Sequence, residues 1–432
     1  MNDTLKKIEN FIKEERLIKS GDKVLLAVSG GIDSMVMLHS LKLLSKRLHF
    51  GIHVAHLDHA IRKNSERDAN FVKRVCKNWN LECTVERRKV EKRKGESLEE
   101  AARRVRYNFL HEVKERVGAE KIATAHHKLD LAETMIYRIL RGVGPLSLYS
   151  IRAKEGELIR PLLVLKREEI EMYAREKGIP FVQDETNFDL TIKRNYIRHR
   201  IIPIMRIINP SLEESFYRLS EISSMLKNFI DKEIERRIKN DVKILKKGME
   251  FSIPEDDFIF SEMIRRTFET LSGKLPEWQM VRRVIKDYKK KSSFKVNFYG
   301  DMGVWKSYDK VFVGDLTLQH LEYKLEQGEF EFDDFLIVVK KDKIHEGVGI
   351  RYVEGMVLRN RKKGDKAGKI KLKDLLIDNK IPAYYRDKIP LVAIGSEVVY
   401  VAGLWVDRKY KGNDFYIGVK KSPLSLKGGN VV

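Results

Sequence analysis

Six consecutive residues near the start of the chain have the types expected of a phosphate-binding turn: Ser29, Gly30, Gly31, Ile32, Asp33 and Ser34. Glycines let the backbone bend sharply and approach a ligand without a Cβ in the way. Backbone N–H groups in such a turn, with a helix N-terminus behind them, can cradle an anion, and the two serine hydroxyls can add hydrogen bonds. Asp33 would repel a bare phosphate, so its presence predicts a bridging Mg²⁺ ion.

The turn differs from the commonest nucleotide-binding motifs. No Lys-Ser/Thr pair closes it, as a Walker A loop requires, and it does not match GxGxxG. A bare Ser-Gly-Gly sequence could equally be a structural tight turn. The more specific signal is the whole stretch VLLAVSGGIDS (24–34), in which a buried run leads into the turn and a helical pattern follows at once.

Two acids and two histidines form a second candidate group. Asp130 and Glu133 stand three residues apart at the start of a predicted helix, so both face the same way, although helix-terminal acids that favour the dipole would look the same. His126 and His127 could join His56 and His59 in a metal site, but adjacent histidines on a strand point to opposite faces. We interpret His126 as a polar residue near the substrates, with a buried, hydrogen-bonded histidine as the alternative.

Arginines occur in two further places that could serve an anionic substrate. Arg103, Arg104 and Arg106 share a predicted helix with acidic residues, and by spacing alone they would be solvated partners of those acids. Arg194 and Arg198, with Asn195 between them, follow the predicted sheet, and guanidinium groups suit phosphate or developing charge.

The elements that must position these residues alternate along the first 210 residues. Short apolar runs such as KVLLAVS and FGIHVAHLD alternate with helical patterns such as SMVMLHSLKLLSKR. This alternation predicts βαβ units and a Rossmann-like, largely parallel sheet, with the glycine turn at the carboxyl ends of its strands. We therefore predict an α/β catalytic domain over 1–210, a mostly helical domain over 211–318 and a small α+β domain over 319–432.

Composition indicates a polyanionic partner. The chain carries 85 Lys+Arg against 63 Asp+Glu, a formal net charge of +22. Such a surplus is typical of nucleic-acid binding, although a heat-stable or salt-tolerant protein with solvated lysines would also show it. The two cysteines, Cys76 and Cys83, offer neither a CxxC pair nor a disulfide framework. With no signal peptide and no run long enough to span a bilayer, we expect a cytoplasmic protein without a membrane partner.

The glycine-turn stretch resembles the PP-loop ATPases, which cleave ATP between the α and β phosphates. Further phrases narrow the resemblance to the tRNA(Ile)-lysidine synthase family: HLDHAIRKNS (56–65), ESLEEAARRVRY (96–107), TAHHKLDLAETMIYRILRGVG (124–144), RPLL (160–163), DETNFDLTIKRNYIRHRIIP (184–203) and the C-terminal stretch that begins RNRKKGDK (359–366). The likeness covers most of the chain and is weakest between about 240 and 320.

The resemblance implies a specific reaction. ATP, with Mg²⁺, would adenylate the wobble cytidine of an isoleucine tRNA with a CAU anticodon, and the ε-amine of free L-lysine would displace AMP to give lysidine. By carry-over, Asp130 and Glu133 hold the substrate lysine, Arg106 lies near lysine or phosphate, and the ATP set extends to His56 and Arg62. A homodimer is an option that the resemblance leaves open.

The resemblance also implies contacts to tRNA. We assign Arg194, Asn195 and Arg198 to the ATP phosphates or to the tRNA backbone. Basic surfaces should supply most of the tRNA affinity, and the leading candidates are KDYKKKSSFK (286–295) and a basic segment that contains Arg359, Arg361, Lys362 and Lys363.

Two other functions compete with this interpretation. A tRNA thiolase of the same superfamily would adenylate a base and then deliver sulfur, but such enzymes commonly use paired cysteines. A tRNA-binding protein that had lost turnover would not need Asp33, Asp130 and Glu133 together with the glycine turn, and all of them are present.

Overall fold

The computed structural model describes residues 2–59, 65–149, 151–183 and 189–424. The chain forms two compact units, Met1–Phe229 and Ile230–Val432, and the boundary falls within the long helix α9 (Leu212–Asp241). Among the described residues, no helix is both long enough and apolar enough to cross a bilayer.

The first unit is built on a six-stranded sheet with the order β3-β2-β1-β4-β6-β5. All neighbouring pairs are parallel except β5 with β6, which confirms the predicted Rossmann-like sheet. The strands are β1 (Lys23–Ala27), β2 (Gly51–Asp58), β3 (Cys83–Arg87), β4 (Lys121–Ala123), β5 (Lys154–Glu155) and β6 (Leu158–Ile159).

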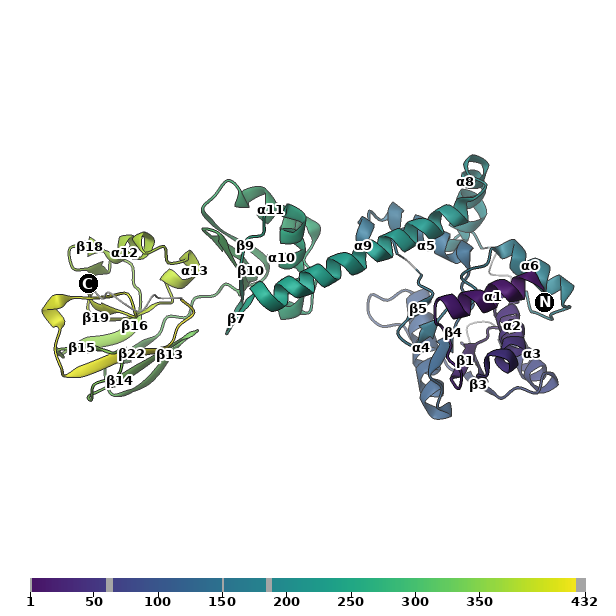
Figure 1. Cartoon of the computed structure of the whole chain (residues 1–432), viewed down its shortest axis with the longest axis horizontal. Helices are drawn as coiled ribbons and strands as arrows, with labels where there is room; N and C mark the ends of the chain where they lie inside the picture. Colours follow the sequence, from purple (N-terminus) through teal and green to yellow (C-terminus); the bar gives the residue numbers. More distant parts are fainter. Residues whose placement is uncertain (1, 60–64, 150, 184–188, 425–432) are drawn as a thin grey trace. The chain divides into compact units, whose positions relative to one another are not determined.

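Alternating residues of β1 pack into two different hydrophobic cores, one on each face of the sheet. The first unit therefore has three layers, with helices on both faces of the sheet. Val24 and Leu26 belong to a core that includes residues of α1, α2 and α6, whereas Leu25 packs with Phe109 and Leu110 of α4. Figure 1 shows the helices around the strands of this unit. The helices of the first unit are α1 (Asp3–Glu14), α2 (Ile32–Leu48), α3 (Ser65–Asn78), α4 (Leu98–Val117), α5 (Lys128–Leu140), α6 (Arg167–Glu176), α7 (Lys193–Tyr196) and α8 (Ile202–Ile208).

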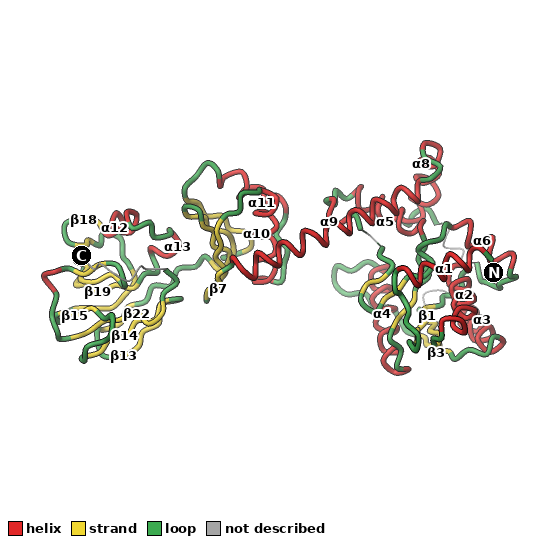
Figure 2. Tube along the Cα trace, viewed as in Figure 1, coloured by secondary structure: helices red, strands yellow, loops and turns green. Residues whose placement is uncertain are grey.

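The second unit contains the predicted helices together with extensive antiparallel sheet, drawn in yellow in Figure 2. After α9 come α10 (Asp257–Ser272) and α11 (Trp278–Tyr288) beside a five-stranded sheet of β7 (Lys243–Leu245), β8 (Gly248–Ser252), β11 (Lys310–Asp315), β10 (Met302–Ser307) and β9 (Ser293–Tyr299).

The C-terminal part of the second unit holds two further sheets. One contains β12 (Glu322–Lys324), β16 (Met356–Asn360), β19 (Pro390–Ile394), β20 (Glu397–Val401), β17 (Lys366–Ala367), β18 (Ile370–Lys371) and β21 (Trp405–Val406). The other contains β13 (Gly328–Phe332), β14 (Phe335–Lys340), β22 (Phe415–Lys421) and β15 (Val348–Ile350). Two short helices, α12 (Leu372–Asp378) and α13 (Ala383–Arg386), accompany them.

One hydrophobic core runs across the predicted boundary at 318/319. Phe312 of β11 stacks on Tyr384 of α13 with ring centroids 5.5 Å apart, and Leu316 shares the same core. The division into two units therefore differs from the three domains expected from sequence, and the limits 1–210, 211–318 and 319–432 stay predictions.

Candidate active site at the carboxyl ends of the parallel strands

A cleft of about 850 Å³ opens at the carboxyl ends of β1, β2 and β4. Ser29 follows β1, Asp58 ends β2 and Thr124 follows β4, and all three line the cleft. Ligands of open parallel sheets bind at this edge, and the volume lies within the range of ligand pockets. The topology thus places the glycine turn in a site large enough for a nucleotide.

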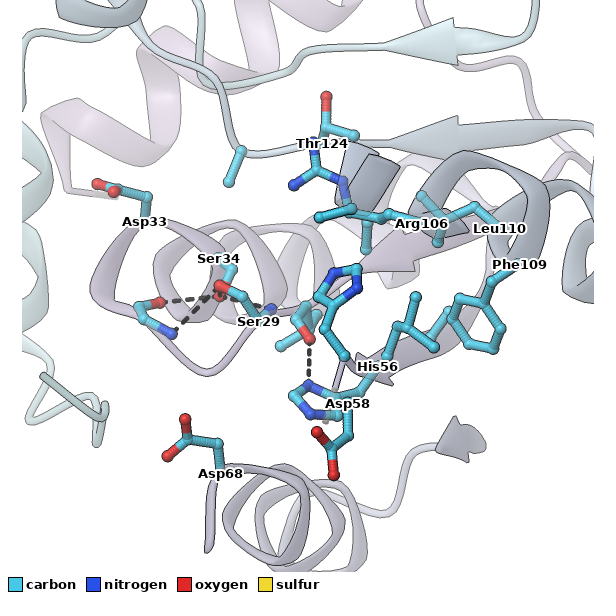
Figure 3. Close-up of a pocket in the computed structure, with 18 of the residues that line it drawn as sticks. Ser29, Asp33, Ser34, His56, Asp58, Asp68, Arg106, Phe109, Leu110 and Thr124 are labelled. Carbon is cyan, nitrogen blue, oxygen red and sulfur yellow. Dashed lines mark hydrogen bonds between the residues drawn. The ribbon is translucent and has the colours of Figure 1, made fainter. Parts of the chain in front are cut away.

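The glycine turn is held by Ser34 (Figure 3). The Oγ of Ser34 accepts hydrogen bonds from the N–H groups of Ser29 and Gly30, both at 3.2 Å, and donates to the carbonyl oxygen of Gly31 at 2.8 Å. Gly30 has φ +93°, a conformation that side chains disfavour. Helix α2 begins at Ile32, and Gly31 at its N-cap supplies no capping side chain, so the first-turn N–H groups remain available to an anion.

Asp33 lies in the first turn of α2 and faces the cleft. Its carboxylate forms an ion pair with Arg167 of α6, and the Nε2 atom of His127 lies 3.7 Å from its Oδ1 atom. Mg²⁺ in nucleotide sites is commonly bound by one or two carboxylates together with substrate phosphates. A single carboxylate beside a phosphate cradle fits that donor set.

Burial lowers the pKa of two histidines of the cleft, His56 and His126. The Nδ1–H of His56 donates to the carbonyl oxygen of Val28 at 2.8 Å, and burial lowers the pKa of His56. The Nδ1 of His126 lies 2.9 Å from the Oγ1 of Thr124, and burial lowers the pKa of His126 to about 3. Within the described ranges, no three His, Cys, Asp or Glu side chains are placed to hold a metal ion, so the alternative of a histidine metal site gains no support.

Arg106 presents a positive charge to the cleft from α4. Its guanidinium lies 5.5 Å from the ring centroid of Tyr107, and no carboxylate in the described part of the chain forms an ion pair with it. Burial lowers the pKa of Arg106, and Arg103 and Arg194 act in the same direction. A half-buried guanidinium without a carboxylate partner among the described residues suits an anionic ligand.

Asp130 and Glu133 are neutralised by two arginines of the chain itself. Arg194 bonds to both acids, through Nε to Glu133 at 2.7 Å and through Nη2 to Asp130 at 3.1 Å. Arg198 does the same, with Nη2 lying 3.2 Å from Asp130 and Nε paired with Glu133. Asp130 also accepts the N–H of His127 at 3.0 Å, which fixes the start of α5. Although burial opposes the charge, the positive neighbours hold the pKa of Asp130 well below its ordinary value.

The structure brings most of the predicted site residues to one place. Arg194 and Asn195 line the cleft with Arg106 and the glycine turn, whereas Asp130, Glu133 and Arg198 are not part of the cleft lining and are joined to it through Arg194. Arg62 lies outside the described residues.

Sequence reasoning missed several residues of the site. Arg167 gave no signal, because it lies 134 positions from the acid it pairs with. Asp58 and Thr124 could have been found from their positions at strand ends. Cys76 has no exposed surface and does not line the cleft, and burial and Cys83 raise its pKa to about 12, as befits a packed thiol.

The predicted basic segment of the second unit is only partly a surface. Arg359 is 1% exposed, and its guanidinium is bound by both carboxylate oxygens of Asp365, at 2.8 and 2.9 Å. This burial and pairing disfavour the expectation that Arg359 belongs to a phosphate-binding surface, because its charge is matched by Asp365. Arg361 pairs with Asp387 at 2.9 Å, whereas Lys362 and Lys363 are exposed, the former paired with Glu322.

The chain is similar in sequence to known protein families and to curated proteins. Residues 1–205 match the sequence family described as the PP-loop domain, and residues 356–417 match the TilS substrate C-terminal domain. A curated tRNA(Ile)-lysidine synthase from Thermotoga sp. (strain RQ2) is 41% identical over 430 residues, which cover 96% of this chain and 99% of that protein. Its counterpart from Thermotoga maritima is 40% identical with the same coverage. The solved U34-tRNA thiolase NcsA from Methanococcus maripaludis matches 51% of this chain and 76% of its own, at 16% identity and a TM-score of 0.43.

Proposed function

We propose that the chain, which belongs to the tRNA(Ile)-lysidine synthase family, joins free L-lysine to carbon 2 of the wobble cytidine of a CAU-anticodon isoleucine tRNA. It is an ATP-using enzyme with a PP-loop domain. The observation that carries the proposal is the convergence, in one cleft, of an anion-binding turn, Asp33 and the guanidiniums of Arg106 and Arg194.

The proposed reaction has two steps, adenylation of the cytosine and displacement of AMP by lysine. The O2 atom of cytosine attacks the α-phosphorus of ATP, and pyrophosphate leaves. The ε-amine of lysine then attacks carbon 2, loses a proton, and expels AMP with the former O2 atom. Lysidine pairs with A instead of G, so the tRNA then reads AUA in place of AUG.

The glycine turn is suited to the phosphates in the first step. The N–H groups of Gly31 and the first turn of α2 would bind phosphate oxygens. The hydroxyls of Ser29 and Ser34 now donate to Ser34 Oγ and to the carbonyl oxygen of Gly31, and each would exchange that bond for one to phosphate. Mg²⁺ bound at Asp33 would neutralise charge on the phosphates. The guanidinium of Arg106 would stabilise charge that develops on the α-phosphate, because it has no carboxylate partner in the described chain.

Asp130 and Glu133 are suited to the second step. Free lysine has an amine pKa of about 10.4, so only about 0.04% is nucleophilic at neutral pH. Carboxylates can bind the ammonium and take part in removing its proton. Both acids are engaged by Arg194 and Arg198 in this structure, so lysine binding at this place requires a guanidinium to move away.

Exposed cations elsewhere would supply tRNA affinity. The candidates are Lys362, Lys363 and the stretch 286–295, in which Lys286 and Lys290 are exposed. Methionine tRNA also carries a CAU anticodon, so discrimination requires contacts beyond the anticodon, which the second unit can provide. A tRNA substrate and unpaired cysteines favour a cytoplasmic enzyme, and a homodimer stays open to measurement.

The direct test is transfer of radiolabelled lysine to RNA. The purified protein is incubated with ATP, Mg²⁺, labelled lysine and an unmodified CAU-anticodon isoleucine tRNA. We expect acid-precipitable label that depends on ATP and survives mild alkali, which would strip an aminoacyl ester. Release of AMP without incorporation of label would support adenylation of the tRNA but would contradict the proposal that lysine is the nucleophile.

A further inference from the structure

One face of α4 forms a wall of the cleft that phosphate binding does not explain. Leu98, Glu99, Ala102 and Arg106 all line the cleft. Residues three and four apart lie on the same side of a helix, so these side chains form one continuous face. Arg106, on the same face, is the residue proposed above to stabilise charge on the α-phosphate.

Two exposed aliphatic side chains border this wall. Leu98 is 48% exposed and Ile192, which precedes α7, is 38% exposed, yet both line the cleft. A single exposed leucine needs no explanation. Two of them in one cleft, with Ala102, supply the apolar surface against which a flat ring can pack.

Glu99 is the carboxylate of this region that the fold leaves unused. Its neighbours have structural partners: Glu96 binds Arg104 at 2.9 Å, and Glu100 accepts the N–H of Ser97 at 2.8 Å to cap α4. Across the described ranges, the Glu99 side chain makes no hydrogen bond or ion pair, and it is exposed toward the cleft.

Glu99 lies within electrostatic reach of the other polar groups of the cleft. Burial opposes the charge of Arg194, but Asp130, Glu133 and, more weakly, Glu99 raise its pKa. Asn195 lines the cleft beside Arg194. Its Nδ2 atom donates to the carbonyl oxygen of Asp189 at 3.0 Å, and its Oδ1 atom is an amide acceptor. Glu99 and Asn195 thus offer polar contacts near the apolar surface of Leu98 and Ile192.

We propose that this wall is the binding site of the wobble base, and that Glu99 selects cytosine by accepting a hydrogen bond from its exocyclic amine. Carboxylates accept from the N4 amine of cytosine, whereas uracil carries an O4 acceptor at the same position. An unpaired base held by an enzyme packs between apolar side chains and is read along its Watson–Crick edge. The inference rests on the proposed function, since it names the residue that chooses the base to be adenylated.

The hydrogen bond would also favour the chemistry. When the amine donates to a carboxylate, electron density in the conjugated ring shifts toward O2, the atom that attacks the α-phosphorus. Uracil would set its O4 lone pairs against the Glu99 carboxylate, which disfavours binding. The same contact would therefore act on both binding and rate for cytidine.

The test compares two transcripts of the same tRNA, with cytidine or uridine at the wobble position. AMP formation is measured for the wild type and for Glu99→Gln. We expect the variant to lose about 10- to 100-fold with the cytidine transcript, because a neutral amide oxygen replaces the charged acceptor. With the uridine transcript it should keep or gain activity, because the new amide N–H can donate to O4 of uracil, so the preference for cytidine collapses. A third transcript with a pyrimidinone that lacks the amine should resemble uridine for the wild type and be insensitive to the substitution.

Glu100→Gln is the matched control, because it removes a neighbouring carboxylate from the helix cap and should keep the full preference. Equal losses on the cytidine and uridine transcripts would leave the preference unchanged and would mean that Glu99 merely supports Arg194. No loss on either transcript would mean that Glu99 does not contact the base, and either result overturns the inference. If the wild type turns over neither transcript, the proposed function itself fails. Thermal melting of each variant confirms that it is folded.

Discussion

The Nε atom of Arg194 lies 2.7 Å from the Oε2 atom of Glu133, whose side chain has 0% exposed surface. Arg198 and Asp130 complete the cluster, so two acids meet two guanidiniums and the formal charge is zero. An acid that has no exposed surface is stable as an anion only with such partners. If these acids bind the ammonium of lysine, as proposed above, that ammonium would replace a guanidinium. Arg194 lines the cleft, whereas Arg198 does not, so Arg194 is the arginine we expect to move.

We expect Asp130→Ala to raise the KM for lysine at least about tenfold, because one charge-assisted contact is worth roughly 1.5–3 kcal/mol. Formation of AMP from ATP and tRNA in the absence of lysine should persist. The substitution also removes the acceptor for the N–H of His127, so stability should fall by about 1 kcal/mol. If adenylation fell while the lysine KM stayed constant, Asp130 would not belong to the lysine site.

Asp33→Asn should abolish Mg²⁺-dependent adenylation and leave tRNA binding largely intact. The amide keeps the size of the side chain but removes the negative charge that would hold the metal ion, and it also breaks the ion pair with Arg167. Filter binding of tRNA and release of pyrophosphate, measured on the same preparation, separate the two effects. Normal turnover by the variant would overturn the metal-binding role.

The stability of the first unit should fall in acid partly through His126. Burial lowers its pKa to about 3, below the ordinary value of about 6.5, so between these pH values the unfolded chain holds the additional proton. The free energy of unfolding therefore decreases as the pH falls through this window, by up to about 1.4 kcal/mol per pH unit for one proton.

His126→Gln should lessen that acid loss. Urea unfolding of the wild type and the variant near about pH 7 and about pH 5 gives the comparison, since other titrating groups cancel in the difference. Equal acid sensitivity in both proteins would show that His126 is not buried in its neutral form.

The sequence predicted what is local and failed where partners are distant in the chain. The turn from Ser29 to Ser34 was identifiable because a buried strand, two glycines and a helix start lie in one continuous stretch. The pairing of Asp33 with Arg167 depends on how α6 packs, and no local pattern encodes that contact. The same limit applies to Arg194 and Arg198, whose side chains alone suit phosphate but whose positions in the fold set them against Asp130 and Glu133.

Arg359 shows why an exposed basic surface is difficult to predict from the sequence. A run of basic residues is expected to be solvated, yet β16 is buried along most of its length, and Leu358, Arg359 and Asn360 are all buried. The counter-ion Asp365 comes from the turn after the strand, with the Lys362 N–H as a second donor to it at 2.7 Å. Charge counting along the sequence cannot separate such a residue from its exposed neighbours.

Arg359→Ala should therefore destabilise the second unit by about 3–5 kcal/mol, because it leaves a buried carboxylate without its partner. Lys363→Ala, at an exposed position of the same segment, is the matched control and should change stability by less than about 0.5 kcal/mol.

In tRNA binding we expect the opposite order, with Lys363→Ala showing an effect and Arg359→Ala showing none. If Lys363 contacts a phosphate, its loss reduces the salt dependence of binding by about one unit of slope, whereas Arg359→Ala measured under conditions where it is folded keeps the wild-type slope. A stable Arg359→Ala protein with a reduced salt slope would return Arg359 to the tRNA-binding surface.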